Sequence, residues 1–194
     1  MMSQMAFDFG EQALEWPKLR QPVFFCIRPT AAAAWDAARI ARKLAADLRC
    51  RVDKIPAERL HISLQGLGDW RQLPDRVIDA ARRAADEISF APFEATFENV
   101  LTLRSGPEPF PSALMGFNAG VRAFHTRLCE RLAANGLRVN QEINPHMTMF
   151  YAPEPVVPRP IDPISFRVSE FVLIRSIQGR GEHRLLGRWP LRKH

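Results

Sequence analysis

Two stretches of the chain repeat one order of elements: a short apolar run, an amphipathic helix, and an alternating segment that begins on histidine. The first stretch starts near Val23 and reaches His61, and the second starts near Ala113 and reaches His146. Two strand–helix–strand units of similar length predict an α+β fold with two pseudo-symmetric lobes, each with an antiparallel sheet and flanking helices. The sequence lacks the glycine-rich strand–helix turn of a doubly wound parallel sheet.

Apolar periodicity predicts the remaining elements. Strands are expected at residues 22–27, 59–69, 93–103, 113–118 and 144–152, and a closing antiparallel pair at residues 166–177 and 184–191. Helices are expected at residues 30–48 (with Thr30 as the N-cap), 74–88 and 121–135, and a proline-rich loop at residues 153–163. Residues 1–19 have no sustained period, so we expect a flexible N-terminal arm followed by a single bilobal domain over residues 20–194.

Composition excludes several classes of protein. Apolar residues make up 46% and charged residues 25% of the 194 positions, as in an ordinary globular chain. No apolar run approaches the roughly 20 residues that cross a bilayer, and the N-terminus has no secretory pattern. The three cysteines are scattered, which is typical of reduced thiols. We therefore expect a cytoplasmic protein that does not contact membranes, and a monomer.

The net charge of +6 comes mainly from arginine, since only four of the 27 basic residues are lysine. Arginine presents a planar fork that suits phosphate, so an anionic partner such as nucleic acid or nucleotide is one interpretation. The other is that these charges simply solvate the surface. Arg28, Arg104 and Arg175 are the candidate phosphate neighbours.

The alternating segments carry the candidate chemistry. On a strand, residues i and i+2 face the same side, so His61 lies beside Ser63 and His146 beside Thr148. If the lobes are paired about a twofold axis, the four side chains line one cleft. Two imidazoles can then act as base and acid near neutral pH, and two hydroxyls can donate to phosphate oxygens. A half-buried histidine with a purely structural role is the competing interpretation.

With these motifs the sequence resembles the two-histidine (2H) phosphoesterases, in particular the RNA 2′,3′-cyclic phosphodiesterases, also called 2′-5′ RNA ligases. The resemblance rests on RLHISLQGLG at residues 59–68 and NPHMTM at residues 144–149, with support from the opening strand and the final hairpin. It implies a bilobal, metal-independent enzyme with its active cleft between the lobes. By that resemblance His61 and His146 are the catalytic pair, and Ser63 and Thr148 bind phosphate.

The family's main reaction opens a 2′,3′-cyclic phosphate to a 2′-phosphate, so the implied partners are RNA ends or small cyclic nucleotides. We take His146 as the base and His61 as the acid, and the sequence itself leaves these two roles interchangeable. Family members often have a basic residue where Tyr151 stands and an aromatic residue where Gly66 stands. These departures put RNA ligation and the exact substrate in question, and Tyr151 or Phe150 could stack on a base instead.

Other chemistry-bearing residues have weaker patterns. His125 is expected on a helix face, and His183 and His194 in solvent, while Trp70 and Phe110 are further candidates for stacking. The sequence has no HExxH, cysteine–histidine cluster or P-loop, so we expect no metal and no cofactor. Two alternatives remain open: a non-catalytic RNA-binding module that uses the same cleft, and a 2H enzyme that acts on 2′-5′ oligonucleotides or a non-RNA cyclic phosphate.

Overall fold

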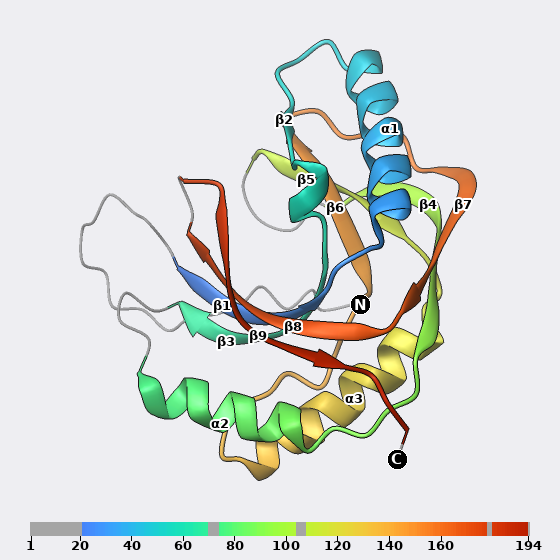
Figure 1. Ribbon diagram of the computed structural model, residues 1–194. Helices are drawn as coiled ribbons and strands as arrows, with labels where there is room; N and C mark the ends of the chain where they lie inside the picture. Colours follow the sequence, from blue (N-terminus) through green and yellow to red (C-terminus); the bar gives the residue numbers. More distant parts are fainter. Residues whose placement is uncertain (1–20, 70–73, 104–107, 178–179, 194) are drawn as a thin grey trace.

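The structure is a computed structural model that describes residues 21–69, 74–103, 108–177 and 180–193 (Figure 1). The arm predicted at residues 1–19 lies outside the described residues, as do Trp70, Arg104 and His194. None of the described helices is long and apolar enough to cross a membrane.

A single nine-stranded sheet forms the centre of the molecule, with the strand order β7-β4-β5-β6-β3-β1-β8-β9 and with β2 beside β6. All of its described pairings are antiparallel. This confirms the α+β class. The strands are β1 (Pro22–Ile27), β2 (Asp53–Lys54), β3 (Ile62–Asp69), β4 (Phe93–Thr102), β5 (Phe110–Met115), β6 (His146–Ala152), β7 (Arg159–Val168), β8 (Glu170–Ile177) and β9 (Glu182–Pro190).

The sheet consists of two four-stranded halves. One half is β3-β1-β8-β9 and the other is β7-β4-β5-β6, and they meet where β3 pairs with β6 through a single register pair, Ile62 with Met147. Within the halves, β1 pairs with β3 and β5 pairs with β6, as the two repeated units predict. The joint between the halves therefore lies beside both predicted histidine motifs.

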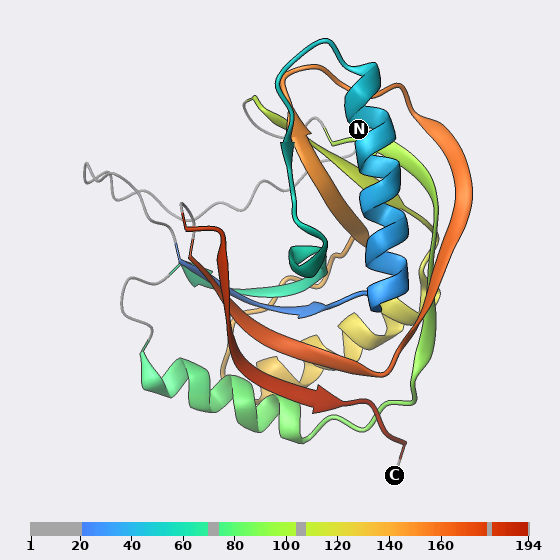
Figure 2. The ribbon, with the colours of Figure 1, turned by 45° about the horizontal axis from the view of Figure 1, so that its top comes forward.

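Helices cover the outer faces of both halves. α2 (Asp75–Asp86) and α3 (Ala119–Ala134) lie side by side beneath β1, β3, β8 and β9, and α1 (Ala31–Asp47) stands against the other half (Figures 1 and 2). A short 3₁₀ turn, η1 (Ala57–Arg59), precedes β3. α1 of the first repeated unit thus packs on β6 and β7 of the opposite half, whereas α3 of the second unit contacts β3 of the opposite half and β4 of its own half.

Local sequence signals explain the helix ends. The backbone N–H of Ala33 donates to the Thr30 hydroxyl at 3.4 Å, which confirms Thr30 as the N-cap of α1. Buried alanines along α1 let the helix lie close to the sheet, with Leu44 completing the buried face. Gly136 follows α3 with a positive φ of 79°, a conformation that glycine adopts at little cost after a helix.

The prediction of a loop over residues 153–163 is wrong in its second half. β7 begins at Arg159 and contains Pro160 and Pro163. Proline lacks a backbone donor, but β7 is the last strand of its half and needs donors on one side only, so an edge strand tolerates proline. The strand predicted at residues 166–177 is also two strands, because the chain turns at Ser169 between β7 and β8.

Candidate active site

The two predicted histidines lie at matching places in the two halves. His61 comes immediately before β3, and His146 is the first residue of β6. The alternation predicted from the sequence is confirmed, because Ile62 and Met147 are completely buried while His61 and His146 retain exposed surface. The imidazoles therefore project from the face of the sheet that is turned away from the main core.

Each imidazole is held by a backbone carbonyl two residues earlier in the chain. Nδ1 of His61 donates to the carbonyl oxygen of Arg59 at 2.7 Å, and Nδ1 of His146 donates to that of Asn144 at 2.8 Å. Because a carbonyl oxygen can only accept, the hydrogen of each neutral ring lies on Nδ1. Nε2 of each ring is left with a lone pair, ready to accept or return a proton.

The joint between the halves brings each histidine to the hydroxyl of the other motif. Ile62 of β3 is paired with Met147 of β6 in antiparallel register. This register puts His61 opposite Thr148, and Ser63 opposite His146. The pairing therefore gathers both imidazoles and both hydroxyls at one place.

The electrostatic surroundings of His61 include the His146 imidazole. Burial lowers the pKa of His61, and positive charge on His146, Arg28 and Arg59 lowers it further. The hydrogen bond to the Arg59 carbonyl acts in the opposite direction, since it favours the protonated ring. In the unliganded protein His61 is therefore held toward its neutral form.

Two arginines supply positive charge beside these rings. Arg28, a predicted phosphate neighbour, directly follows β1, and its charge lowers the pKa values of His61 and His183. Arg59 was not singled out by sequence reasoning. Its Nε is buried and has no hydrogen-bond partner within the described residues. A side-chain carbon at Gly181 would stand only 3.1 Å from Arg59 Nη1, so the chain leading into β9 passes close over this guanidinium.

The prediction that His183 faces solvent is wrong. Its ring is partly buried on β9, and its centroid lies 5.5 Å from that of His61, with the two planes at 73°. Phe24 of β1 completes the cluster, at 5.2 Å from His61 and 6.3 Å from His183. Burial, together with charge on His61 and the two arginines, lowers the pKa of His183 to about 4.

The two candidates for base stacking are separated by an irregularity in β6. Ala113 of β5 is paired with Thr148 and Ser112 with Phe150, so Met149 is an extra, bulged residue. The bulge turns Phe150 into the core, where it is completely buried, and leaves Tyr151 37% exposed. Phe150 is therefore unavailable for stacking, and that prediction is wrong. Tyr151 remains a candidate on the exposed face.

β3 contains the same irregularity. Cys26 of β1 is paired with Ser63 and Phe25 with Gln65, so Leu64 is bulged in the position that matches Met149. Gln65 turns inward as Phe150 does, and Gly66 matches Tyr151. The two halves thus share their bulge as well as their histidine and hydroxyl, but on the exposed face beyond the bulge one half has Gly66 and the other has Tyr151.

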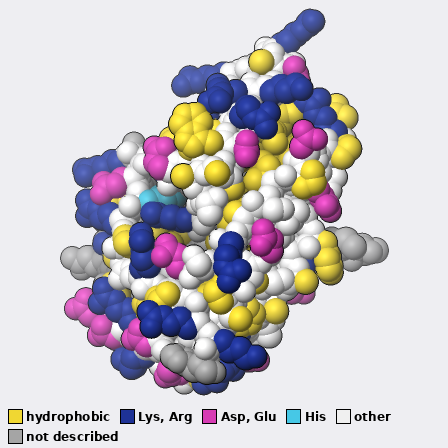
Figure 3. Space-filling view, turned by 45° about the vertical axis from the view of Figure 1, so that its right-hand side comes forward, with side chains coloured by type: hydrophobic (Ala, Val, Ile, Leu, Met, Phe, Trp, Pro, Cys, Tyr) yellow, Lys and Arg dark blue, Asp and Glu magenta, His cyan; other side chains and the backbone are white. Residues whose placement is uncertain are grey.

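The remaining predicted residues lie elsewhere. His125 lies on α3 as expected but is buried, with its Nε2 3.4 Å from the Cys129 sulfur. Arg175 is on β8, two strands away from β3, and Phe110 opens β5. Over the described ranges, no group of three or more His, Cys, Asp or Glu side chains is placed to hold a metal ion. Basic and acidic side chains are interspersed on the face seen in Figure 3.

Comparison with protein families matches residues 27–180 to the 2′-5′ RNA ligase superfamily. A comparison with curated proteins finds no match. Among solved structures, E. coli LigT complexed with ATP has a TM-score of 0.69 and 24% identity, covering 90% of this chain and 99% of that one. The protein TT0787 of Thermus thermophilus has a TM-score of 0.73 and 17% identity, covering 89% and 99%. At these identities the two structures support the fold alone.

Proposed function

The chain belongs to the 2′-5′ RNA ligase superfamily of two-histidine phosphoesterases, and from that premise we propose that it hydrolyses 2′,3′-cyclic phosphates to 2′-phosphates. The substrates are RNA ends or small cyclic nucleotides. The observation that carries the proposal is the matched pair of imidazoles, each with Nδ1 tied to a backbone carbonyl and Nε2 left to exchange a proton.

The reaction needs one base and one acid. His146 accepts a proton from water as the water oxygen bonds to phosphorus, and the bond from phosphorus to O3′ breaks. His61 donates a proton to the departing O3′, so that charge and atoms balance without a metal ion. Ser63 and Thr148 donate to the non-bridging oxygens, where negative charge builds up in the transition state.

The acid role of His61 requires the substrate's own charge. Burial and neighbouring cations lower the pKa of His61 in the free protein, which favours the neutral ring. An anionic phosphate between the imidazoles acts in the opposite direction and raises the pKa of His61. The complex can therefore retain one proton on the pair, and Arg28 and Arg59 balance the remaining phosphate charge.

Relatives support a ligand that carries phosphate. E. coli LigT has been solved with phosphate and with 3′-AMP, and also with ATP and with NADP⁺. We propose that Tyr151 stacks on the base of such a ligand here, because it is exposed beyond the bulge on the strand that carries Thr148. Burial and the Asp53 carboxylate raise the pKa of Tyr151, which keeps the phenol protonated at neutral pH.

Rate measurements in EDTA test the proposal against its alternatives. Purified protein is given a 2′,3′-cyclic mononucleotide, a 2′-5′-linked oligonucleotide and a cyclic phosphate without a base. We expect the cyclic nucleotide to be turned over fastest, and His61→Ala or His146→Ala to lose about 10²–10⁴ in rate. Thr126→Ala, a change at an exposed hydroxyl on α3, is the control and should keep wild-type rates.

Two outcomes would contradict the proposal. Wild-type turnover in both histidine variants would remove the acid–base pair. Salt-sensitive binding of RNA without any product, from well-folded protein, would favour the non-catalytic binding module instead.

A further inference from the structure

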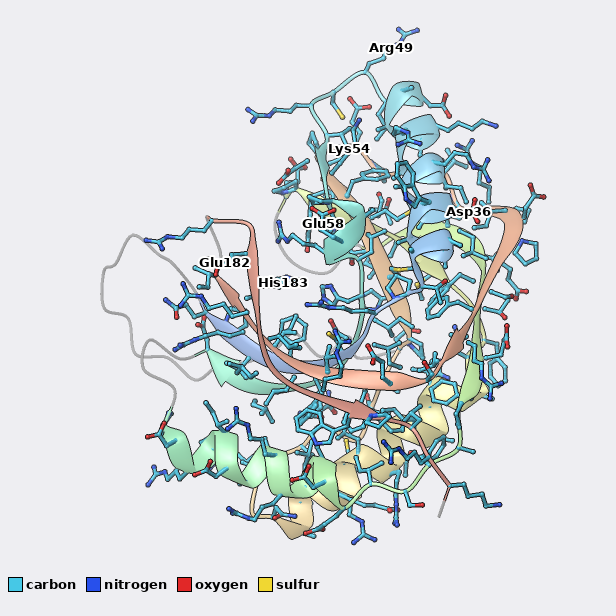
Figure 4. All side chains as sticks on the ribbon, in the orientation of Figure 1. Asp36, Arg49, Lys54, Glu58, Glu182 and His183 are labelled. Carbon is cyan, nitrogen blue, oxygen red and sulfur yellow. The ribbon has the colours of Figure 1, made fainter. Side chains whose placement is uncertain are left out.

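His183 reaches the site from a part of the chain far from both motifs. It lies on β9, beside the hairpin of β8 and β9 and near the middle of the molecule in Figure 4. Its backbone is paired with Ser176 of β8. The centroid of its ring lies 5.5 Å from that of His61, in a T-shaped contact. Because Phe24 packs on both rings, the rings of Phe24 on β1, His61 before β3 and His183 on β9 form one cluster.

The charged groups that lower the pKa of His183 are all cationic. His61, before β3, Arg59 of η1 and Arg28, after β1, all act on it as positive charges. On its own strand, Glu182 is paired with Arg184 at 2.7 Å, and neither side chain contacts His61 in any described interaction. No carboxylate among the described residues therefore favours a charged His183, and the ring stays neutral at neutral pH.

We propose that His183 is a positioning residue for His61. Its ring closes one side of the His61 imidazole, and with Phe24 it fixes the plane in which His61 presents Nε2. The backbone hydrogen bond to the Arg59 carbonyl fixes only one atom of the His61 ring, so rotation about that bond must be limited by neighbours. This role rests on the proposed function of His61 as the acid.

His183 orients His61 by the packing of its ring, and its ring nitrogens are not needed for this role. Replacing it with alanine opens the cluster to water and lets the His61 ring rotate, so the pKa of His61 should rise toward its ordinary value. Replacing it with phenylalanine keeps the packing and the dry environment. Misplacing a catalytic group by a small distance costs up to about 100-fold in rate, and we expect a loss of about tenfold in kcat/KM for His183→Ala.

The test combines a titration with kinetics on the full chain. The C–H resonances of the His61 ring are followed by NMR against pH, without substrate, in wild type, His183→Ala, His183→Phe and the control Leu185→Ala. Leu185 lies on the same strand, is exposed, and has no described ring contact with His61. Thermal unfolding of each variant identifies any that fail to fold.

The expected result is a raised His61 pKa and about tenfold lower kcat/KM in His183→Ala. In His183→Phe and Leu185→Ala the His61 pKa should stay at its wild-type value, and kcat/KM should stay within about threefold of wild type. An unchanged His61 pKa in His183→Ala, or a His183→Phe variant as impaired as His183→Ala, would overturn the proposal. If the wild type hydrolyses no cyclic phosphate, the proposed function fails, but the titration still decides whether His183 positions His61.

Discussion

Ile62 of β3 pairs with Met147 of β6, and this contact is the described backbone pairing between the two halves of the sheet. Both side chains are completely buried, so the residues on either side of them point to the opposite face. The antiparallel register then crosses the motifs, with His61 facing Thr148 and Ser63 facing His146. One buried pair thus aligns all four polar side chains of the candidate site.

The crossed arrangement predicts equal dependence on the two hydroxyls. We expect Ser63→Ala and Thr148→Val each to lower kcat by about 10²–10³, because each removes one donor to the developing charge. Ser63→Thr and Thr148→Ser keep the donor and should stay within about tenfold of wild type. Steady-state rates on a cyclic nucleotide measure this. A loss confined to one of the two hydroxyls would argue against a shared site.

The lowered pKa of His61 predicts different pH profiles for free and bound enzyme. kcat/KM reports the free protein, where the pKa of His61 lies below its ordinary value. On the alkaline side of the profile, kcat/KM should therefore begin to fall at an unusually low pH. kcat reports the complex, where the phosphate raises the pKa of His61 and moves this fall to higher pH. Profiles recorded from pH 4 to 9 check the order of the two falls. If the alkaline sides of the two profiles coincide, phosphate binding leaves the pKa of His61 unchanged.

The pKa of His183 predicts loss of stability in acid. Above pH 6.5 this histidine is neutral in both the folded and the unfolded chain, so it contributes nothing. Between about pH 6.5 and pH 4 the unfolded chain binds a proton that the folded protein excludes, and the free energy of unfolding falls. The loss is about 1–2 kcal/mol after allowing for partial solvent screening.

Denaturant unfolding of wild type and His183→Phe, at pH 7 and pH 5, measures this contribution. Burial also lowers the pKa values of His61 and His125, so both proteins should lose stability in acid. The phenylalanine variant should lose less. The same loss in both proteins would mean that His183 titrates normally when folded.

The exposed position of Tyr151 predicts a role in binding the base. Stacking of an aromatic side chain on a base is worth about 1–3 kcal/mol. Tyr151→Ala should therefore raise KM for a cyclic nucleotide by about 5- to 150-fold and leave KM for a base-free cyclic phosphate, such as glycerol 1,2-cyclic phosphate, unchanged. Tyr151→Phe is the matched control and should behave as wild type. An equal rise in KM on both substrates would assign Tyr151 to phosphate binding or to structure.

Sequence reasoning located the candidate catalytic pair because the signal is local. A histidine followed two residues later by a hydroxyl, with buried residues between and after, is enough to place both side chains on one face of a strand. The repeat of strand, helix and strand then indicated that the two motifs occupy equivalent positions. The pairing of Ile62 with Met147, which brings them together, depends on long-range packing and could only be proposed.

Strict alternation failed where the strands are irregular. It places Phe150 on the face of His146 and Thr148, whereas the bulge at Met149 moves Phe150 inside and Tyr151 outside. A bulge inserts one residue without a distinctive local sequence, so the pattern of apolar residues does not reveal it. The loop predicted over the prolines of β7 was wrong for a different reason. Proline normally indicates a loop, but the edge strand of a sheet tolerates it.

His183 illustrates a third kind of failure. Its neighbours in sequence indicate only a hairpin, and its contact with His61 results from the order β3-β1-β8-β9 across the sheet. Arg59 was also overlooked, although it lies within the first motif. The candidate site residues were chosen from the pattern of histidine and hydroxyl, which does not include it. Both residues reach the site through tertiary structure that single-sequence periodicity does not contain.

Phosphorus NMR of a 2′,3′-cyclic nucleotide, incubated with the protein in ¹⁸O-labelled water and EDTA, tests the two-histidine reaction directly. Catalysis by the two histidines predicts a 2′-phosphate that carries one labelled oxygen, formed by wild type and by neither His61→Ala nor His146→Ala. A 3′-phosphate product, or a 2′-phosphate formed equally by the two histidine variants, would contradict it.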